Sequence, residues 1–287
     1  MYKSDEEYKI SQKSRQKDFY NERFSDIQRG LAKLRDPTLL YDLNLVKKIL
    51  AEAHLSKNSI VLEVCAGQST DAILISDYVG TVISTDISFH ALQTAQELSQ
   101  LKNKDNISFV VCDAEHLPFH DDIFDFAFCK DALHHVLNPT KVLSDMRRCS
   151  KNLKKITVIE ANAYNPQMIL IGLLYYSIDK GVFRNTKKNL IRMFRDSLLS
   201  DIEVEYSEFL PGHILFYVRS PLLKILFKYP RLMNVVKFIN KVERRVERLC
   251  YINKFTNFII ISGTKSKSEL DMTKVIESRR ELGGISK

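Results

Sequence analysis

Short apolar stretches alternate with amphipathic stretches along the chain from residue 59 to residue 160. The apolar stretches predict buried strands at 59–64, 81–86, 107–113, 124–129 and 155–160. The segments between them carry apolar residues at helical spacing and predict helices at 70–79, 88–101 and 140–150. Continuous apolar strands separated by amphipathic helices are typical of a parallel sheet that is covered by helices on both faces.

The pattern is looser outside this region. Residues 5–30 are polar with scattered aromatics and predict a surface helix, and 36–55 predicts a second helix that begins at Asp36-Pro37. Beyond residue 160, the predicted elements are helices at 166–178 and 187–199, a half-exposed strand at 202–209 and an apolar last strand at 255–262.

These elements predict one α/β domain with additions. We expect a Rossmann-like, seven-stranded, mostly parallel sheet with helices on both faces, preceded by N-terminal helices and interrupted by a helical insertion before the last strand. The expected parts are an N-terminal helical cap at 1–55, a core at 56–211, a basic apolar insertion at 212–253, the last core strand at 254–265 and a charged tail at 266–287.

Composition is compatible with a large core and a reducing environment. Of the 287 residues, 45% are hydrophobic, which is enough for a domain of this size. The five cysteines are scattered and form no CxxC pair, so we expect no metal site. The charged N-terminus lacks the apolar core of a secretion signal, and no apolar run is long enough for a spanning helix. The sequence therefore favours a cytoplasmic protein.

The net charge of +8 is concentrated in one segment. Residues 212–250 contain nine basic and two acidic side chains among large apolar ones. This composition suits a helix that lies on anionic lipid, and it equally suits a hydrophobic lid with a basic rim or a helical appendage with a solvated face. We therefore expect peripheral contact with an anionic membrane through 212–250, with the lid and the appendage as alternatives.

Polar residues stand at the ends of four successive predicted strands. They are Glu63 with the following Cys65-Ala66-Gly67, Asp86, Asp113-Ala114, and Lys130-Asp131. Because ligands bind beyond the carboxyl ends of parallel strands, these residues are expected to line one site. A small-residue turn lets backbone N–H groups approach a ligand closely, and a carboxylate ending the second strand can accept hydrogen bonds from ribose hydroxyls.

Three motifs resemble those of the class I S-adenosylmethionine-dependent methyltransferases. "VLEVCAGQS" at 61–69 is similar to the glycine-rich motif of that family, and "STDIS" at 84–88 to its acidic ribose motif. "VVCDAEHLPFHDDIFDFAFCKDALHHV" at 110–136 is similar to the adenine motif and the fourth strand. The resemblance extends from about residue 60 to residue 160 and implies S-adenosyl-L-methionine as cofactor.

The resemblance implies a cofactor site made of Glu63, Ala66, Gly67, Asp86, Ile87, Asp113, Ala114 and Lys130. By this resemblance, the residues after the first strand contact the methionine part of the cofactor. The acidic residue at the end of the second strand holds the ribose, and its neighbour packs on the adenine. The residues after the third strand border the adenine, and the lysine lies near the methyl group.

The first loop departs from the family pattern at two positions. Cys65 and Ser69 stand where the family has its first and last glycines. Both residues are small, and we expect neither position to require a positive φ. A dinucleotide would need close backbone approach to a pyrophosphate, whereas S-adenosylmethionine has no phosphate. The substitutions therefore disfavour a dehydrogenase more than a methyltransferase.

Methyl transfer is an in-line displacement that mainly requires correct positioning of the acceptor. A base is also useful for oxygen or protonated-nitrogen acceptors, and His134, His135 and Asp131 are the candidates. Alternatively, at least one histidine fixes the loop after the fourth strand, and Asp131 caps a following helix. Tyr20 and Phe24 are candidates for a lid over the cofactor or for simple packing.

The acceptor is expected to be a small molecule. The fourth strand is followed by "CKDALHH", which lacks the Pro-Pro-aromatic motif of base N-methyltransferases and the Pro-Cys motif of RNA cytosine-C5 enzymes. Nucleic acid is therefore disfavoured, with an RNA methyltransferase kept as an alternative. We expect O- or N-methylation of an amphiphilic or anionic biosynthetic intermediate. A catalytically degenerate cofactor-binding scaffold or partner subunit is the other alternative, and the sequence does not indicate an oligomeric state.

Overall fold

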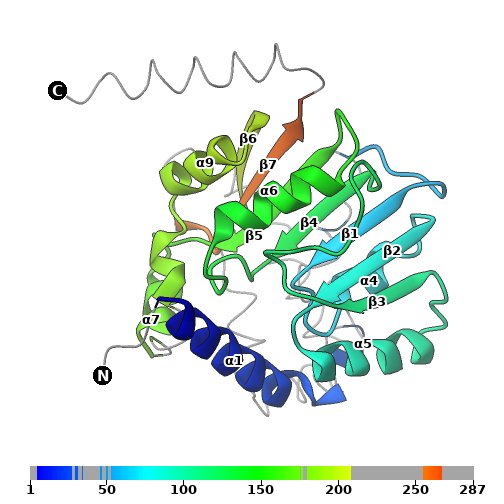
Figure 1. Ribbon diagram of the computed structural model, residues 1–287, viewed down its shortest axis with the longest axis horizontal. Coiled ribbons are helices and arrows are strands. Elements are labelled where there is room, and N and C mark those ends of the chain that lie inside the picture. The colour runs from blue at the N-terminus through cyan, green and yellow to red at the C-terminus, as the bar shows by residue number, and fades with distance from the viewer. Residues whose placement is uncertain are drawn as a thin grey trace, which may run out of the picture.

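A mixed sheet forms the centre of the molecule in the computed structural model (Figure 1). The structure describes residues 5–27, 30–31, 34, 46, 50, 53–174, 176, 180–207 and 255–266. Within them, seven strands have the order β3-β2-β1-β4-β5-β7-β6. Their bounds are β1 Ile60–Val64, β2 Thr81–Asp86, β3 Ile107–Val111, β4 Phe126–Lys130, β5 Lys155–Ala161, β6 Leu199–Ser207 and β7 Phe258–Lys265. The predicted Rossmann-like, mostly parallel sheet is confirmed.

Strands β1 to β5 are parallel, and β7 is antiparallel to both of its neighbours, β5 and β6. In the register, Val64 of β1 pairs with Thr85 of β2 and with Cys129 of β4. Asp86 at the end of β2 pairs with Val111 at the end of β3. Because the strands end at matching levels, the residues that follow them emerge at one edge of the sheet.

Helices connect and cover the strands. Their bounds are α1 Asp5–Phe24, α4 Thr70–Ile75, α5 Phe89–Leu101, α6 Pro139–Cys149, α7 Pro166–Leu174 and α9 Lys187–Asp196, with a 3₁₀ helix, η1, at Lys180–Arg184. Side chains of Ser88, Asn138 and Thr186 accept hydrogen bonds from backbone amides three residues later, which explains where α5, α6 and α9 begin. Pro139 fits the first turn of α6, where its missing N–H costs nothing.

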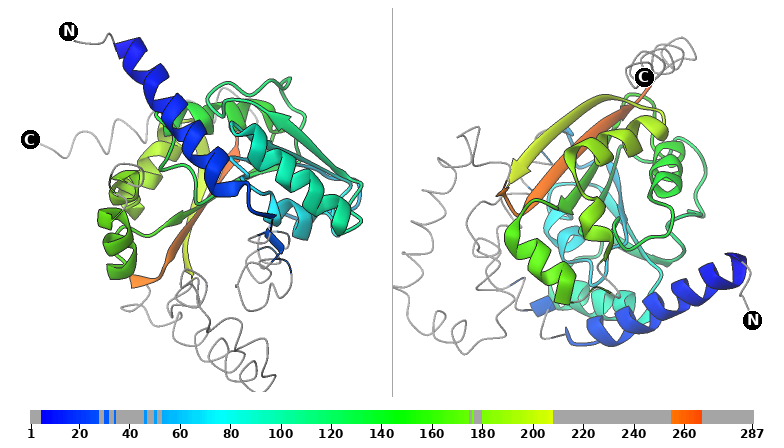
Figure 2. Two further views of the ribbon diagram at one scale, coloured as in Figure 1. Left: turned by 90° about the horizontal axis from the view of Figure 1, so that it is seen from below. Right: turned by 90° about the vertical axis from the view of Figure 1, so that its left-hand side faces the viewer.

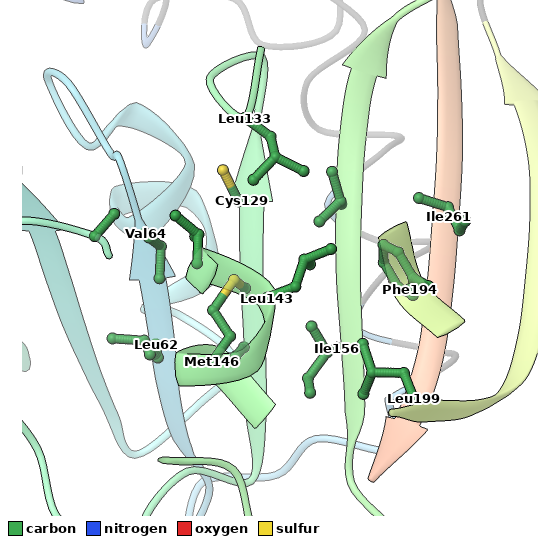
Figure 3. Packing of buried hydrophobic residues seen from close by; sticks show 14 of the residues in the cluster. Leu62, Val64, Cys129, Leu133, Leu143, Met146, Ile156, Phe194, Leu199 and Ile261 are labelled. Atoms are coloured by element: carbon green, nitrogen blue, oxygen red, sulfur yellow. The ribbon is translucent and has the colours of Figure 1, made fainter. Parts of the chain in front are cut away.

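The two faces of the sheet bury different residues because side chains alternate along a strand. On one face, α6 and α9 pack over the sheet. Figure 3 shows Leu143 and Met146 of α6 between Leu62 and Ile156, and Phe194 of α9 beside Ile261. The opposite face buries Val61, Phe126, Phe128, Ile159 and Ile260 together with Ala72 and Ile75 of α4. The central strands are therefore apolar on both sides, as the sequence pattern predicts.

Helix α1 lies next to α5 in the three views (Figures 1 and 2). It is strongly polar, and its described side chains are all exposed or half-buried. Its residues reach the segments that follow β1, β2, β3 and β4, through Phe24, Asn21, Lys13 and Gln16 respectively. This helix therefore runs along the carboxyl edge of the parallel strands.

Several predicted boundaries differ from the structure. Helix α4 ends at Ile75 rather than at residue 79, and β3 ends at Val111 rather than at residue 113. The segment 132–137 forms turns rather than a helix, so the expected capping of a helix by Asp131 is wrong; Asn138 caps α6 instead. Most of the helix predicted at 36–55, the insertion at 212–253 and the tail beyond 266 lie outside the described residues. The division into five parts stays a prediction.

Candidate functional site

The loop after β1 has an unusual backbone. Cys65, Gly67 and Ser69 all have left-handed backbone conformations, with φ of 57°, 54° and 50°. The expectation that Cys65 and Ser69 would avoid positive φ is therefore wrong. A side chain in this region costs roughly 1–2 kcal/mol per residue because Cβ approaches the carbonyl oxygen. The chain keeps the turn that glycines usually make and tolerates the strain at two of the three positions.

Hydrogen bonds hold this loop against β2. The Ala66 amide donates to the Thr85 carbonyl at 2.9 Å, and the Gly67 amide donates to Oδ2 of Asp86 at 2.8 Å. The other oxygen of Asp86 accepts the Ser88 amide at 2.8 Å. Burial raises the pKa of Asp86, although these amide hydrogen bonds oppose the shift. Asp86 therefore links the loop after β1 to the start of α5.

Glu63 is buried beside this loop. Ser84 Oγ donates to Glu63 Oε2 at 2.7 Å, and Ser84 Oγ also lies 2.7 Å from Ser69 Oγ. Burial raises the pKa of Glu63 to about 8, and the negative charge of Asp71 adds to this shift. The Ser84 hydrogen bond and the charge of Lys130 act in the opposite direction. Burial therefore favours the protonated form of Glu63.

Lys130 at the end of β4 forms an ion pair with a residue that the sequence analysis missed. Its Nζ donates to Asp71 Oδ1 at 3.0 Å, and both side chains are 13% exposed. Asp71 lies in the first turn of α4, directly after the strained loop. No sequence motif marks Asp71, because its role depends on the meeting of α4 with the end of β4.

The end of β3 has two acidic residues that contact α1. Asp113 Oδ1 accepts the Glu115 amide at 3.0 Å, and Asp113 Oδ2 accepts Lys13 Nζ at 2.5 Å. Burial disfavours the charge of Asp113, but the hydrogen bond from Lys13 and the Glu115 amide outweigh it and lower its pKa. The adjacent Ala114 is buried, and Ile87 at the end of β2 is half-buried. Lys13 is another residue that no motif indicates.

Aromatic side chains of α1 lie over the loops after β1 and β4. Tyr20 and Phe24 stack with ring centroids 5.6 Å apart, and Tyr20 makes an edge contact with His135 at 5.3 Å. A Cβ added to Gly67 would lie 3.3 Å from the Phe24 ring. The Gln68 side chain donates to the Phe24 carbonyl at 2.9 Å, which holds the end of α1 in place. The predicted lid residues therefore lie beside the predicted cofactor loop.

The two histidines have different surroundings. His134 is buried, and its Nδ1 lies 2.5 Å from Glu160 Oε2, which also accepts Asn185 Nδ2 at 2.7 Å. His135 is only half-buried and lies between His134 and Tyr20, with ring centroids at 3.8 and 5.3 Å. His134 thus belongs to a hydrogen-bonded network inside the protein, whereas His135 faces α1.

Glu160 organises the turn after β4. Its Oε1 accepts the backbone amides of Ala132 at 3.1 Å and Leu133 at 2.6 Å. Ligand atoms of Asp131, His134 and Glu160 lie within 4.8 Å of one another, a spacing that a metal ion could use. Because both oxygens of Glu160 already accept two hydrogen bonds each, we assign this group to holding the turn rather than to binding a metal.

The structure brings the predicted residues together at one edge. The Gly67 amide donates to Asp86. Glu63 is linked to the loop after β1 through Ser84 and Ser69. Lys130 pairs with Asp71, whose negative charge also acts on Glu63. The residues after β3 join them through the Cys112 amide, which donates to the Asp86 carbonyl at 3.0 Å, and through the contacts of α1. The strand order with an antiparallel β7, together with acidic residues ending β2 and β3, defines a Rossmann-like methyltransferase fold.

Comparison with known proteins agrees with this class. The family described as "Methyltransferase domain" matches residues 55–198, just over half of the chain, and the chain belongs to this family of S-adenosylmethionine-dependent domains. Demethylmenaquinone methyltransferase of Staphylococcus carnosus is 32% identical over 108 residues, which cover 37% of this chain and 44% of that protein. The chain thus spans about half the length, or less, of the curated relatives it matches.

Two solved structures show the same fold. The methyltransferase chain in complex with the Haloferax volcanii Trm112 methyltransferase activator has a TM-score of 0.61 at 17% identity, and the match covers 86% of this chain and 98% of that one. Phosphoethanolamine N-methyltransferase 2 of Haemonchus contortus with S-adenosyl-L-methionine has a TM-score of 0.58 at 19% identity, covering 78% and 53%. At these identities, the likeness supports the fold.

Proposed function

We propose that this protein transfers a methyl group from S-adenosylmethionine to a small-molecule acceptor. The observation that carries the proposal is the position of three acidic residues at one edge, beside a loop with a left-handed glycine. Glu63 lies near the end of β1, Asp86 ends β2, and Asp113 follows the neighbouring strand β3 by two residues. Three acidic side chains at one edge can receive the polar groups of an adenosine and of an amino-acid tail.

The residues present fit this cofactor. Gly67 presents backbone without a side chain at the loop, and Asp86 keeps unused lone pairs after accepting two amides, so it can also accept ribose hydroxyls. Asp71 and Lys130 offer opposite charges for a zwitterionic tail. Ile87 and Ala114 leave apolar surface beside Asp113 for an adenine ring. When bound, the cofactor supplies an activated methyl group, so the protein mainly has to position the acceptor.

On the acceptor side, we assign the base to His135 and a positioning role to His134. His135 lies at the contact between the turn after β4 and Tyr20, next to the end of β4 where the methyl group is expected. His134 is held by Glu160 and fixes the turn that carries its neighbour. Asp131, whose backbone is left-handed with φ of 52°, is the second candidate base at this turn.

The acceptor proposed here is small and amphiphilic or anionic. Two similar proteins carry the names demethylmenaquinone methyltransferase and phosphoethanolamine N-methyltransferase, which describe an amphiphilic quinone and an anionic amine. The basic, apolar sequence 212–250 supports the same class, although it lies outside the described residues. No helix among the described residues combines the length and apolar character that crossing a bilayer requires.

Calorimetry with S-adenosylhomocysteine tests the cofactor site. We expect micromolar binding to the wild type and a loss of about tenfold to a hundredfold for Asp86→Asn, because hydrogen bonds to charged groups contribute about 1.5–3 kcal/mol each. Asp105→Asn, on an exposed turn, is the matched control and should bind as the wild type does. Absence of binding to the wild type would contradict the proposal.

Turnover tests the acceptor class. Tritium transfer from labelled S-adenosylmethionine should be measured to phosphoethanolamine, to a demethylated quinone and to total RNA. Transfer to either small molecule supports the proposal, and His135→Asn should then lower kcat about a hundredfold without changing cofactor affinity. Transfer to RNA alone favours the RNA alternative, and cofactor binding without any transfer favours a scaffold.

Vesicle flotation tests the proposed membrane contact. If the protein floats with anionic vesicles but not with neutral ones, the lipid contact is supported. If it floats with neither, the result argues against that contact.

A further inference from the structure

Lys13 of α1 contacts two acidic residues that follow β3. Its Nζ contacts Asp113 Oδ2 at 2.5 Å and Glu115 Oε2 at 3.1 Å, so one ammonium joins two carboxylates. The three side chains are 26%, 33% and 11% exposed. Burial disfavours the ammonium, but the hydrogen bonds to the two carboxylates outweigh it and raise the pKa of Lys13. The contact is therefore charged at neutral pH.

This ion pair uses the atom that an adenine would need. Asp113 Oδ1 already accepts the Glu115 amide at 3.0 Å, and Oδ2 accepts Lys13. We propose that Lys13 stands in for the adenine amino group at Asp113 Oδ2 and that the cofactor displaces it from this oxygen on binding. This inference rests on the proposed function, because it requires an adenosine cofactor at Asp113.

Glu115 gives the displaced ammonium another partner. An ammonium has three donors, and Lys13 Nζ already lies within hydrogen-bond distance of Glu115 Oε2. The other oxygen of Glu115 accepts the Asn138 amide at 3.0 Å, which fixes the carboxylate in place. His116 Nδ1 lies 3.8 Å from Asp113 Oδ2, but its side chain is 71% exposed. Lys13 can therefore leave Asp113 and remain paired, and α1 closes again over the bound cofactor.

The remaining contacts of α1 allow the helix to move away from the strand ends and to pack against them again. They include the hydrogen bond of Ser88 Oγ to Asn21 Oδ1 at 2.6 Å, the Gln16 hydrogen bond to the His135 carbonyl and the Phe24 ring at Gly67. These contacts join α1 to the loops after β2, β4 and β1, so they cover the whole proposed cofactor site. A helix held by a few polar contacts opens at a lower free energy than the core strands.

Displacement of Lys13 predicts a specific change in the association and dissociation rates of the cofactor. Removing Lys13 frees Asp113 before the cofactor arrives, so association should become faster. It also removes the Lys13–Glu115 contact that holds the closed helix, so dissociation should become faster too. General damage to the site would instead slow association or leave it unchanged while it accelerates dissociation.

The test is surface plasmon resonance of S-adenosylhomocysteine on the immobilised full chain. We expect Lys13→Met to raise both rate constants about twofold to fivefold, a range typical of losing one partly exposed ion pair. Lys17→Met, on the exposed side of the same helix, is the control and should match the wild type. In an Asp113→Asn background, Lys13→Met should change the association rate much less, because the neutral amide no longer forms an ion pair with Lys13.

The outcomes separate the two proposals. Absence of binding to the wild type contradicts the proposed function. If the wild type binds but Lys13→Met associates no faster than the wild type, the proposed role of Lys13 is overturned and the proposed function is not. If Lys13→Met does not fold, Lys13→Gln replaces it, because glutamine keeps a polar side chain without the charge. The association rate of that variant is then compared with the wild-type rate in the same way.

Discussion

The hydroxyl oxygens of Ser69 and Ser84 lie 2.7 Å apart in the buried interior, joining the loop after β1 to β2. Ser84 of β2 also donates to Glu63 of β1, so hydrogen bonds through β2 connect the loop to β1, the strand it follows. This arrangement gives a physical role to a serine at a position where a glycine would satisfy the backbone more easily. The hydrogen bond offsets part of the strain of the left-handed conformation at Ser69.

The first prediction concerns the two strained positions. At both Cys65 and Ser69, a glycine variant should be more stable than an alanine variant by about 1 kcal/mol, because only alanine keeps a Cβ at positive φ. Ala66→Gly, which lies between them without a positive φ, should instead lose stability. Urea unfolding of the five variants measures this order. Equal stability of the glycine and alanine variants would show that the loop is not strained.

The second prediction concerns the pH dependence of stability. Burial raises the pKa of Glu63 from its ordinary value of 4.5 to about 8, so the folded state keeps a proton that the unfolded state loses between these values. The free energy of unfolding should therefore fall as pH rises from about 5 to about 8, by at most about 1.4 kcal/mol per pH unit from this group.

Glu63→Gln should remove this slope because the amide does not titrate. Glu97→Gln, at an exposed position of α5, should keep it. Urea unfolding at pH 5, 6, 7 and 8 gives the comparison. A slope that survives in Glu63→Gln would assign the proton to another group.

The third prediction concerns Glu160. Its two oxygens accept four hydrogen bonds from buried donors, so Glu160→Gln places an amide group against at least one donor. We expect a loss of about 3 kcal/mol in unfolding free energy, because removing a buried acceptor leaves its donors unsatisfied. Glu203→Gln, whose parent side chain is 64% exposed, should change stability by less than about 0.5 kcal/mol. Comparable losses for both variants would contradict a special role for Glu160.

The fourth prediction concerns Gly67. Gly67→Ala adds a Cβ at φ of 54° and 3.3 Å from the Phe24 ring, so it should lower stability by about 1–2 kcal/mol and weaken binding of S-adenosylhomocysteine about tenfold. Adding Phe24→Ala should remove the steric part of the loss but not the backbone part. Calorimetry on the single and double variants separates them. Unchanged affinity of Gly67→Ala would place the cofactor away from this loop.

The sheet followed directly from the sequence. Short apolar stretches such as 81–86 and 155–160 cannot be exposed on either face, which predicts central parallel strands. Boundaries were less reliable where turns decide them. The predicted helix at 70–79 ends at Ile75, and the Tyr78 amide already makes a turn hydrogen bond to the Ile75 carbonyl.

The grouping of Glu63, Asp86, Asp113 and Lys130 at one edge was also predictable, since each lies at or near the carboxyl end of a parallel strand. The partners of these residues were not. Lys13 pairs with Asp113 across 100 residues of sequence, and Lys130 pairs with Asp71 across 59. No local spacing encodes such contacts, because they depend on where α1 and α4 come to lie against the strand ends.

The sequence by itself determined the class of fold and the acidic edge, because hydrophobic periodicity and residues at strand ends are local properties of the chain. Only the tertiary structure decided that Cys65 and Ser69 adopt left-handed backbones, that Glu63 is buried deeply enough to hold its proton, and that α1 covers the edge. Backbone strain, desolvation and long-range ion pairs arise from packing between distant segments, so they exist only once the chain has folded.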